Sequence, residues 1–332
     1  MKLVTYQIDV QPYLGIIVDH KVYNLNSCDP LIPDNMRDFL QGGEVTMQKA
    51  RLIEEKLKTE RLVIKPEASY KLLAPVPHPA SCRDAYAFRQ HVATARMNRG
   101  LPMIPEFDHY PIFYYSNHQS ICGPGSIRCM PDHFKKLDFE LEVAVVLNKK
   151  GRNVKAAEAD SFIAGYMIMN DMSARTLQME EMLFNLGPSK GKDFCTILGP
   201  WLVTHDELEA YKVTTKHGHT GNSYNLKMVC RVNGIEVSSG NLADMDWTFA
   251  EIIERASYGC ELFPGDVIGS GTVGTGCFLE LNGTGLLKDP EYQPKWLLPE
   301  DAIELEVTGL GILENKIKAE NSHWSILKLK KL

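Results

Sequence analysis

Short apolar runs separated by turn residues make up most of the chain after residue 80. Runs of this length that are rich in β-branched and aromatic residues are typical of strands. The predicted strands lie at residues 139–147, 166–169, 201–204, 227–232, 266–269, 277–281 and 302–307. Helical spacing of apolar residues interrupts them at 156–164 and 244–256. The pattern predicts a mostly β (α+β) fold with a rolled or barrel-like sheet.

The first 75 residues have a pattern of their own. Two short β-type runs at 13–18 and 21–25 precede a helical stretch at 36–58 that is interrupted at Gly42-Gly43. The proline-spaced residues 74–79 then predict an extended linker, because prolines at that spacing disfavour both helix and ladder. We therefore expect a small N-terminal domain at 1–73 and a larger domain at 74–332.

Composition narrows the class of protein. A hydrophobic content of 44% and a charged content of 23% are ordinary for a globular chain of 332 residues. The net charge of −6 argues against a nucleic-acid partner, and no run approaches the ~18 apolar residues of a membrane span. No signal-like apolar stretch opens the chain, and its eight cysteines form no Cys-x-x-Cys pair. These features predict a reduced, cytoplasmic enzyme that binds neither nucleic acid nor membrane.

Three acidic residues alternate along the predicted strand at 137–147. Asp138, Glu140 and Glu142 would share one face, and the strand continues into an apolar run. A bare carboxylate near a core is costly, so these groups need a partner such as a bound cation. The alternative is a solvent-facing acidic edge, which protects a sheet from aggregation. The residues alone leave both interpretations open, a bound cation and a solvent-facing edge.

Asp171 favours the cation. It ends an apolar run and directly precedes Ser173-Ala174-Arg175, as in a site built at a strand terminus. The alternative is that Asn170 or Asp171 caps a helix running through Gln178. A site made only of carboxylate oxygens would prefer Mg²⁺, Mn²⁺ or Ca²⁺ to zinc.

His91 is a candidate general base. It follows Asp84, Tyr86, Arg89 and Gln90 within eight residues. A catalytic histidine needs a partner, normally a carboxylate, on its far ring nitrogen. Sequence order does not identify that partner, and a lone histidine is more often structural or exposed.

The run from Gly269 to Gly274 satisfies the pattern G-x-G-x-x-G and follows a predicted strand. A dinucleotide-binding fingerprint must open a helix, whereas residues 277–281 read as a strand. We therefore reject a dinucleotide site and expect these glycines to allow a tight turn or a close approach of the backbone to a ligand.

Taken together, the motifs resemble the fumarylacetoacetate hydrolase family. Four stretches carry the resemblance in the family's order: D-A-Y-A-F-R-Q-H at 84–91, L-D-F-E-L-E at 137–142, G-Y-M-I-M-N-D-M-S-A-R-T-L-Q at 165–178 and G-K-D-F-C-T-I-L-G-P-W at 191–201. A fifth stretch between 246 and 272 agrees, and the match covers about residues 70–310. Within the family, the motif at 84–91 resembles the fumarylacetoacetase type.

The resemblance implies a mixed β-sandwich-roll catalytic domain, usually in a homodimer, with one divalent cation (Mg²⁺ or Ca²⁺, with Mn²⁺ possible) and no organic cofactor. The implied residues fall into four groups: metal ligands Asp84, Glu140, Glu142 and Asp171; the base His91 held by Glu280; the substrate-facing Arg175, Gln178 and Lys192; and Tyr86 and Thr272 for carboxylate or keto oxygens. Thr196 corresponds to a place where the family can hold a second, structural ion. Arg99 lies one residue out of register with a substrate-binding arginine, and Met182-Leu183 replace a substrate-facing tyrosine.

The implied activity is metal-dependent hydrolysis of a carbon–carbon bond in a β-diketo acid. Fumarylacetoacetate is the first candidate, and its cleavage to fumarate and acetoacetate ends tyrosine breakdown. The alternatives are hydrolysis of another acylpyruvate or diketo acid, a decarboxylase or dehydratase of the same family, and a non-enzymatic metal-binding protein. A base beside a metal site favours the enzymes, because a binding protein needs no base.

Overall fold

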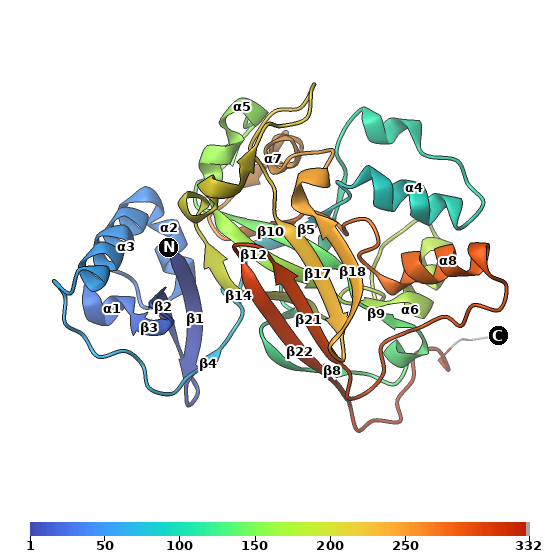
Figure 1. Ribbon diagram of the computed structural model, residues 1–332, viewed down its shortest axis with the longest axis horizontal. Coiled ribbons are helices and arrows are strands. Elements are labelled where there is room, and N and C mark those ends of the chain that lie inside the picture. Colours follow the sequence, from blue (N-terminus) through green and yellow to red (C-terminus); the bar gives the residue numbers. More distant parts are fainter. Residues whose placement is uncertain (330–332) are drawn as a thin grey trace.

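The structure is a computed structural model that describes residues 1–329. Its largest element is an 11-stranded sheet that runs through the middle of the molecule (Figure 1). The strands follow the order β3 (Lys21–Asn24), β2 (Gln11–Val18), β1 (Lys2–Ile8), β14 (Thr196–Val203), β12 (Ile163–Asp171), β10 (Leu141–Leu147), β20 (Asp266–Gly269), β5 (Ser81–Ala85) and β6 (Phe113–Ser116), with β4 (Lys71–Leu72) on β1 and β7 (Ile121–Cys122) on β14.

A five-stranded sheet packs on one face of this sheet. Its order is β18 (Ile235–Asn241), β17 (Lys227–Val232), β21 (Ala302–Val307), β22 (Gly311–Ala319) and β8 (Gly125–Cys129). Three two-stranded pairs complete the strands: β11 (Gly151–Arg152) with β19 (Glu261–Leu262), β13 (Ser173–Ala174) with β9 (Leu137–Asp138), and β15 (Lys212–Val213) with β16 (Ser223–Tyr224).

Helices cover the two ends of the sandwich. In Figure 1, α1 (Leu25–Cys28), α2 (Met36–Gln41) and α3 (Gly43–Lys58) lie at one end, and α4 (Arg89–Met97), α6 (Arg175–Met182) and α8 (Phe278–Lys288) lie at the other. The remaining helical segments are α5 (Ala156–Ala159), α7 (Phe249–Ser257) and the 3₁₀ turns η1 (Pro105–Asp108), η2 (His133–Lys135), η3 (Asp160–Phe162), η4 (His205–Tyr211) and η5 (Leu242–Asp244). Across residues 1–329, every helix is too short or too polar to cross a membrane.

Strand β10 is buried on both faces, which explains its apolar run. Val143 and Val145 belong to the core cluster that includes Leu305 of the five-stranded sheet, whereas Ala144 and Val146 belong to the cluster that includes residues of α2 and α3. Side chains alternate between the faces of a strand, so each face of β10 meets a different layer. The predicted strand is confirmed, and an exposed acidic edge at this place is wrong.

The first 73 residues continue the main sheet. Lys2 of β1 pairs with Val203 of β14, and the cluster that contains Leu14 and Phe39 also contains Met167 and Leu198. The helical stretch at 36–58 is confirmed, with its interruption between α2 and α3. The division into two domains, 1–73 and 74–332, stays a prediction.

Three predicted elements differ from the structure. Residues 277–281, predicted as a strand, form the N-cap and the first turn of helix α8, which begins at Phe278. A short apolar run does not distinguish the two states by itself, and Gly283 and Gly285 inside α8 weaken its helical pattern. The reason given above for rejecting a dinucleotide site is therefore wrong, although the loop that ends at Gly274 is separated from α8 by Thr275, Gly276 and Cys277.

The other two differences concern helix length. The segment predicted at 156–164 is a single turn, α5, followed by η3, and Ile163 already belongs to β12. The helix predicted from 244 begins at Phe249, because Thr248 and Glu251 form a capping box that sets the start of α7.

Candidate active site

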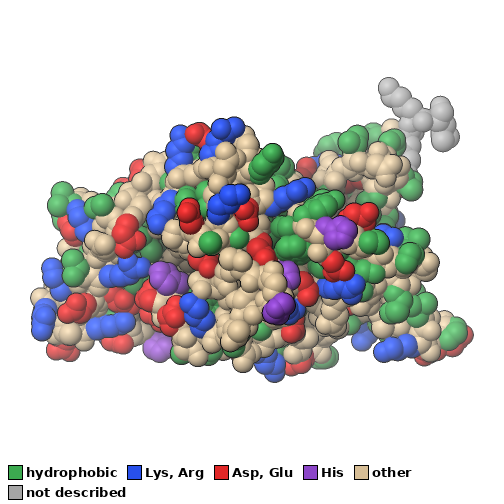
Figure 2. Space-filling view, turned by 90° about the horizontal axis from the view of Figure 1, so that it is seen from above, with side chains coloured by type: hydrophobic (Ala, Val, Ile, Leu, Met, Phe, Trp, Pro, Cys, Tyr) green, Lys and Arg blue, Asp and Glu red, His purple; other side chains and the backbone are tan. Residues whose placement is uncertain are grey.

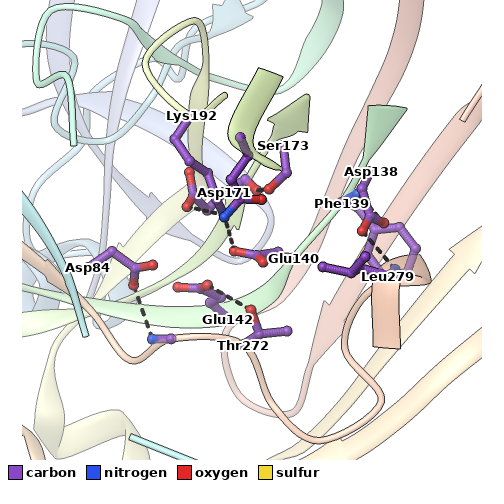
Figure 3. A network of polar contacts seen from close by, with 12 residues as sticks. Asp84, Asp138, Phe139, Glu140, Glu142, Asp171, Ser173, Lys192, Thr272 and Leu279 are labelled. Atoms are coloured by element: carbon purple, nitrogen blue, oxygen red, sulfur yellow. Dashed lines mark hydrogen bonds and ion pairs between the residues drawn. The ribbon is translucent and has the colours of Figure 1, made fainter. Parts of the chain in front are cut away.

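Four acidic side chains carried by β12, β10 and β5 of the main sheet, with Glu140 just before β10, converge in the interior (Figure 3). Asp84 lies in β5, Glu142 lies in β10 with Glu140 just before that strand, and Asp171 ends β12. One carboxylate oxygen from each lies within 4.8 Å of the others, and all four residues are buried. We call these four residues the carboxylate cluster.

Strand pairing places the cluster. Glu142 lies opposite Met169 in the antiparallel β10–β12 pair, and Asp84 lies opposite Gly269 in the parallel β20–β5 pair. Gly269 leaves space for its neighbour, because a Cβ at that position would lie 2.5 Å from Oδ1 of Asp84. The backbone N–H of Gly271 donates to the same oxygen at 3.1 Å. These glycines therefore let the backbone approach Asp84 closely, and an approach to a ligand stays a prediction.

Two buried cations and a phenol contact the cluster. Lys192 Nζ donates to Asp171 Oδ2 at 2.7 Å and also to Glu140, and Arg175 Nη2 donates to Glu140 Oε1 at 2.8 Å. The hydroxyl of Tyr114 donates to Asp171. Tyr114 lies opposite Asp84 in the β5–β6 pair, which brings its side chain to the cluster. No sequence motif indicates the contact between Tyr114 and Asp171.

The donor set fits a divalent cation. Glu142 Oε2 and Asp171 Oδ1 are buried and have no hydrogen-bond partner among the described residues. An unpaired buried carboxylate oxygen is costly, and hard cations such as Mg²⁺, Mn²⁺ and Ca²⁺ bind carboxylate oxygens. A cation among these four groups would satisfy both oxygens at once.

The pKa values of the cluster also indicate that it needs a cation. Burial, and then the charge of Asp171, raise the pKa of Asp84 to about 7, and burial together with Asp84 raises the pKa of Glu142 well above its usual value. Burial acts on Glu140 in the same direction, but Lys192 and Arg175 outweigh it and lower the pKa of Glu140 to about 2. The protein's own cations therefore neutralise only part of the cluster.

A histidine–carboxylate pair lies beside the cluster. His91, in the first turn of α4, has its Nδ1 2.6 Å from Oε2 of Glu280, in the first turn of α8, and both residues are buried. A ring nitrogen of His91, a carboxylate oxygen of Glu140 and the Sγ of Cys277 lie within 4.8 Å of one another. An ionised carboxylate only accepts hydrogen bonds, so Glu280 favours the tautomer with a proton on Nδ1 and a free lone pair on Nε2.

The remaining predicted residues lie around these two groups. Gln178 Oε1 accepts from Arg175 Nη1 at 2.9 Å, and Thr272 Oγ1 donates to Glu142 at 3.4 Å. The Tyr86 ring packs edge-on against His91 at 5.7 Å, and burial raises the pKa of its phenol to about 12.

Two predicted residues stand apart. Thr196 pairs with Asp171 in the sheet, and its hydroxyl lies 3.1 Å from that of Ser116. Arg99 is exposed and its Nε donates to the backbone oxygen of Ala95 at 3.0 Å. Exposed Met182 ends α6, the helix that carries Arg175 and Gln178.

Asp138 does not join the cluster, although the strand pattern placed it on the face of Glu140 and Glu142. The chain leaves ladder pairing at Phe139 and Glu140, between β9 and β10, so the alternation is interrupted. Figure 3 shows Asp138 turned away toward Leu279. The alternative of a helix cap at Asp171 is also wrong, because α6 begins after Ala174.

The chain is similar to known proteins over most of its length. Residues 81–318 match the sequence family described as Fumarylacetoacetate (FAA) hydrolase C-terminal. The human protein named oxaloacetate tautomerase FAHD2A, mitochondrial, is 31% identical over 321 residues, which cover 96% of this chain and 91% of that protein. The fumarylacetoacetate hydrolase domain-containing protein 2 homolog of Dictyostelium discoideum is 28% identical over 324 residues, covering 96% and 97%.

Two solved structures share the fold. The fumarylacetoacetate hydrolase of Exiguobacterium antarcticum superposes with a TM-score of 0.69 at 24% identity, over 96% of this chain and 100% of that one. The maleylpyruvate hydrolase of Sphingobium sp. SYK-6, in complex with manganese (II) ion and pyruvate, superposes with a TM-score of 0.68 at 20% identity, over 97% and 100%. The mixed, sheet-dominated fold expected from the sequence is confirmed.

Proposed function

The chain belongs to the fumarylacetoacetate hydrolase family, and on that premise we propose that it uses a divalent cation and His91 to move a proton at the carbon beside a keto group of a small keto acid. The observation that carries the proposal is the His91–Glu280 pair, whose histidine lies within 4.8 Å of Glu140 of the carboxylate cluster. A base and a cation site so close together act on adjacent atoms of one substrate.

Asp84, Glu140, Glu142 and Asp171 would hold the cation. When bound, it would polarise the keto oxygen and make the neighbouring C–H more acidic. Mg²⁺, Ca²⁺ and Mn²⁺ all suit this oxygen donor set. Lys192 and Arg175 hold Glu140 ionised, so that one ligand is ready to bind without first losing a proton.

His91 performs the proton transfer in this proposal. Nε2 accepts the proton from the carbon, while Glu280 keeps the other proton on Nδ1 and stabilises the imidazolium that forms. The imidazolium of His91 would then give up that proton to the keto oxygen, which completes the keto–enol conversion and restores the neutral histidine. We place Arg175, Tyr86 and Thr272 at the substrate's carboxylate or keto oxygens, and Arg99 at the entrance.

Oxaloacetate is the first substrate to test, because relatives about 31% identical over 96% of the chain are named oxaloacetate tautomerases. In this proposal the reaction needs only His91 and the cation site, and a ring nitrogen of His91 lies within 4.8 Å of a carboxylate oxygen of Glu140.

A second candidate is the hydrolysis of fumarylacetoacetate or another acylpyruvate. It is favoured by Gln178, which Arg175 holds through the amide oxygen, so that the amide nitrogen can donate to an oxyanion. Here His91 would take a proton from water, and the carbon–carbon bond would break as the tetrahedral oxyanion collapses. The departing carbon would leave as an enolate.

One assay separates the candidates. The purified protein is given enol oxaloacetate and, separately, fumarylacetoacetate, with Mg²⁺, Mn²⁺ or Ca²⁺ and with EDTA, and both reactions are followed by ultraviolet absorbance. We expect EDTA-sensitive loss of the enol, with deuterium appearing at the carbon beside the keto group in heavy water. Fumarate and acetoacetate as products would establish hydrolysis instead, and no reaction with any ion would contradict both candidates.

We also propose the homodimer that the resemblance implies and the cytoplasmic location that the composition predicts. The human relative is named as mitochondrial. Light scattering after gel filtration tests the homodimer: a mass near twice 37.3 kDa is expected. A mass equal to one chain would contradict it.

A further inference from the structure

Asp138 is a buried carboxylate that touches neither the proposed cation nor the proposed base, yet it accepts hydrogen bonds from the segments that carry both. It is fully buried, and it has a separate place from the carboxylate cluster in Figure 3. Its Oδ1 accepts the N–H of Phe139 at 2.9 Å, just before Glu140. Its other hydrogen bonds come from helices α8 and α6.

Asp138 caps helix α8 from 140 residues away in the chain. The first two N–H groups of the helix, those of Phe278 and Leu279, donate to Asp138 at 2.8 and 2.9 Å. Cys277 at the N-cap position supplies no side-chain hydrogen bond. A carboxylate at this end also interacts favourably with the helix dipole. The next residue of the helix is Glu280, the partner of His91.

The same carboxylate holds Arg175. The guanidinium donates to Asp138 Oδ2 through Nε at 2.8 Å, to Glu140 Oε1 through Nη2 at 2.8 Å, and to Gln178 Oε1 through Nη1 at 2.9 Å. A guanidinium presents its donors in a rigid plane, so fixing one edge fixes the others. Asp138 thus orients a side chain that holds one ligand of the carboxylate cluster.

We propose that Asp138 is a positioning residue that sets the distance between the His91–Glu280 pair and the carboxylate cluster. One fixed carboxylate joins the start of α8 to Arg175, so the base and the cation site cannot shift independently. A misplacement of about 1 Å in a reacting group costs on the order of 100-fold in rate, which is the size of effect that this link would prevent. The inference rests on the proposed function for its kinetic test but not for its structural one.

The kinetic test is a double-mutant cycle. Asp138→Asn keeps the volume but places an amide nitrogen against N–H donors, and we expect kcat to fall about 100-fold in a protein that remains folded by circular dichroism. If Asp138 acts through Glu280, Asp138→Asn/Glu280→Gln has a kcat within about twofold of that of Glu280→Gln alone. Multiplying effects in the double variant would assign Asp138 a purely structural role and overturn the proposal.

Asp266→Asn is the matched control. Asp266 is also buried, accepts a backbone N–H from Phe263 at 2.9 Å and lies 3.7 Å from Arg83, but it contacts neither α6 nor α8. We expect this variant to lower the melting temperature and leave kcat unchanged.

The structural test reads the His91–Glu280 hydrogen bond directly. The Nδ1 proton of His91 is followed by NMR in protein labelled with ¹⁵N-histidine. We expect its downfield resonance to move or vanish in Asp138→Asn and to stay in Asp266→Asn. If the asparagine variant does not fold, Asp138→Glu is measured in its place. The glutamate keeps the charge that Arg175 needs but extends the side chain by about 1.5 Å. An unchanged resonance in both Asp138 variants would overturn the proposal, even if neither candidate substrate reacts.

Discussion

Glu140 differs from the other three members of the carboxylate cluster because two cations contact it. Lys192 and Arg175 lower its pKa to about 2, whereas burial and neighbouring carboxylates raise the pKa values of Asp84, Glu142 and Asp171. Lys192 therefore makes contacts beyond the substrate-facing role that the resemblance implies: its ammonium donates to two members of the carboxylate cluster, Glu140 and Asp171. A divalent cation would neutralise the rest.

His91→Ala tests the base. General-base catalysis contributes about 10²- to 10⁴-fold, so we expect kcat to fall within that range with either candidate substrate. The affinity for Mn²⁺, measured by isothermal titration calorimetry, should change little, because His91 is not a member of the cluster. Full activity in the alanine variant would show that the cation alone performs the reaction, as in a decarboxylase that needs only a Lewis acid.

Glu142→Gln tests the cation site. Glu142 accepts a long hydrogen bond from Thr272 at 3.4 Å, and its Oε2 has no hydrogen-bond partner among residues 1–329. We expect Mn²⁺ affinity to fall by more than about tenfold, while the metal-free protein keeps or gains stability because a like charge is removed. Glu314→Gln on the exposed face of β22 is the control. Equal affinities in the two variants would place the cation elsewhere.

Among the secondary-structure elements, helix α8 is capped by a distant part of the chain. Its start depends on Asp138, a residue that is remote in sequence, while α7 carries its own capping box at Thr248 and Glu251. Local capping signals can be read from a sequence, but a cap supplied across the fold cannot. The loop between β20 and α8 also depends on a segment that is remote in sequence, because its contact with β5 sets its shape.

Gly271→Ala tests this loop. Gly271 has φ +79°, and a Cβ there would lie 2.4 Å from the backbone oxygen of Ala85, so the loop must move away from β5. The N–H of Gly271 would then leave Asp84, and we expect weaker Mn²⁺ binding as well as a loss of stability of about 1–3 kcal/mol.

Gly100→Ala separates backbone strain from this contact. Gly100 has φ +69°, but nothing lies within 4 Å of the position that the added methyl group would take. Thermal unfolding and Mn²⁺ titration of both variants make the comparison. If Gly100→Ala weakened Mn²⁺ binding as much as Gly271→Ala, the argument from the loop would be wrong.

On the scale of the whole molecule, the site lies where the layers meet. The strands that carry Glu142 and Asp171 lie between the five-stranded sheet and the N-terminal helices, so neither face of these strands reaches solvent. Figure 2 shows a surface on which acidic and basic side chains are mixed on one part of the face, while hydrophobic side chains gather on another. The charges that matter for the proposed chemistry are inside.

Cation binding should therefore couple to stability and to pH. The pKa of Asp84 in the folded, metal-free protein is raised from 3.8 to about 7, so its contribution to stability is present below about pH 4 and is lost as the pH rises through 7. Added Mn²⁺ competes with protons for the same oxygens. We expect Mn²⁺ to raise the melting temperature more at about pH 8 than at about pH 5.5, with EDTA as the reference. An equal or larger gain at the lower pH would contradict a carboxylate site.

The sequence by itself determined the central strands β10 and β12 and the residue types of the site. Period-two alternation and short apolar runs predicted β10 and β12, and the motifs around Asp84, Glu140 and Asp171 named the acids that the structure brings together. These signals are local, since each depends on neighbours along one strand.

Only the tertiary structure decided which side chains touch. The partner of His91 lies 189 residues away and was named only through the family resemblance. Tyr114 reaches Asp171 from another strand, and Asp138 leaves the strand face that its spacing suggested and caps α8. Such contacts depend on strand register and on how helices pack over the sheet, and neither leaves a periodic signal in the chain. The residue types therefore indicate which chemistry is available, and the fold decides which atoms perform it.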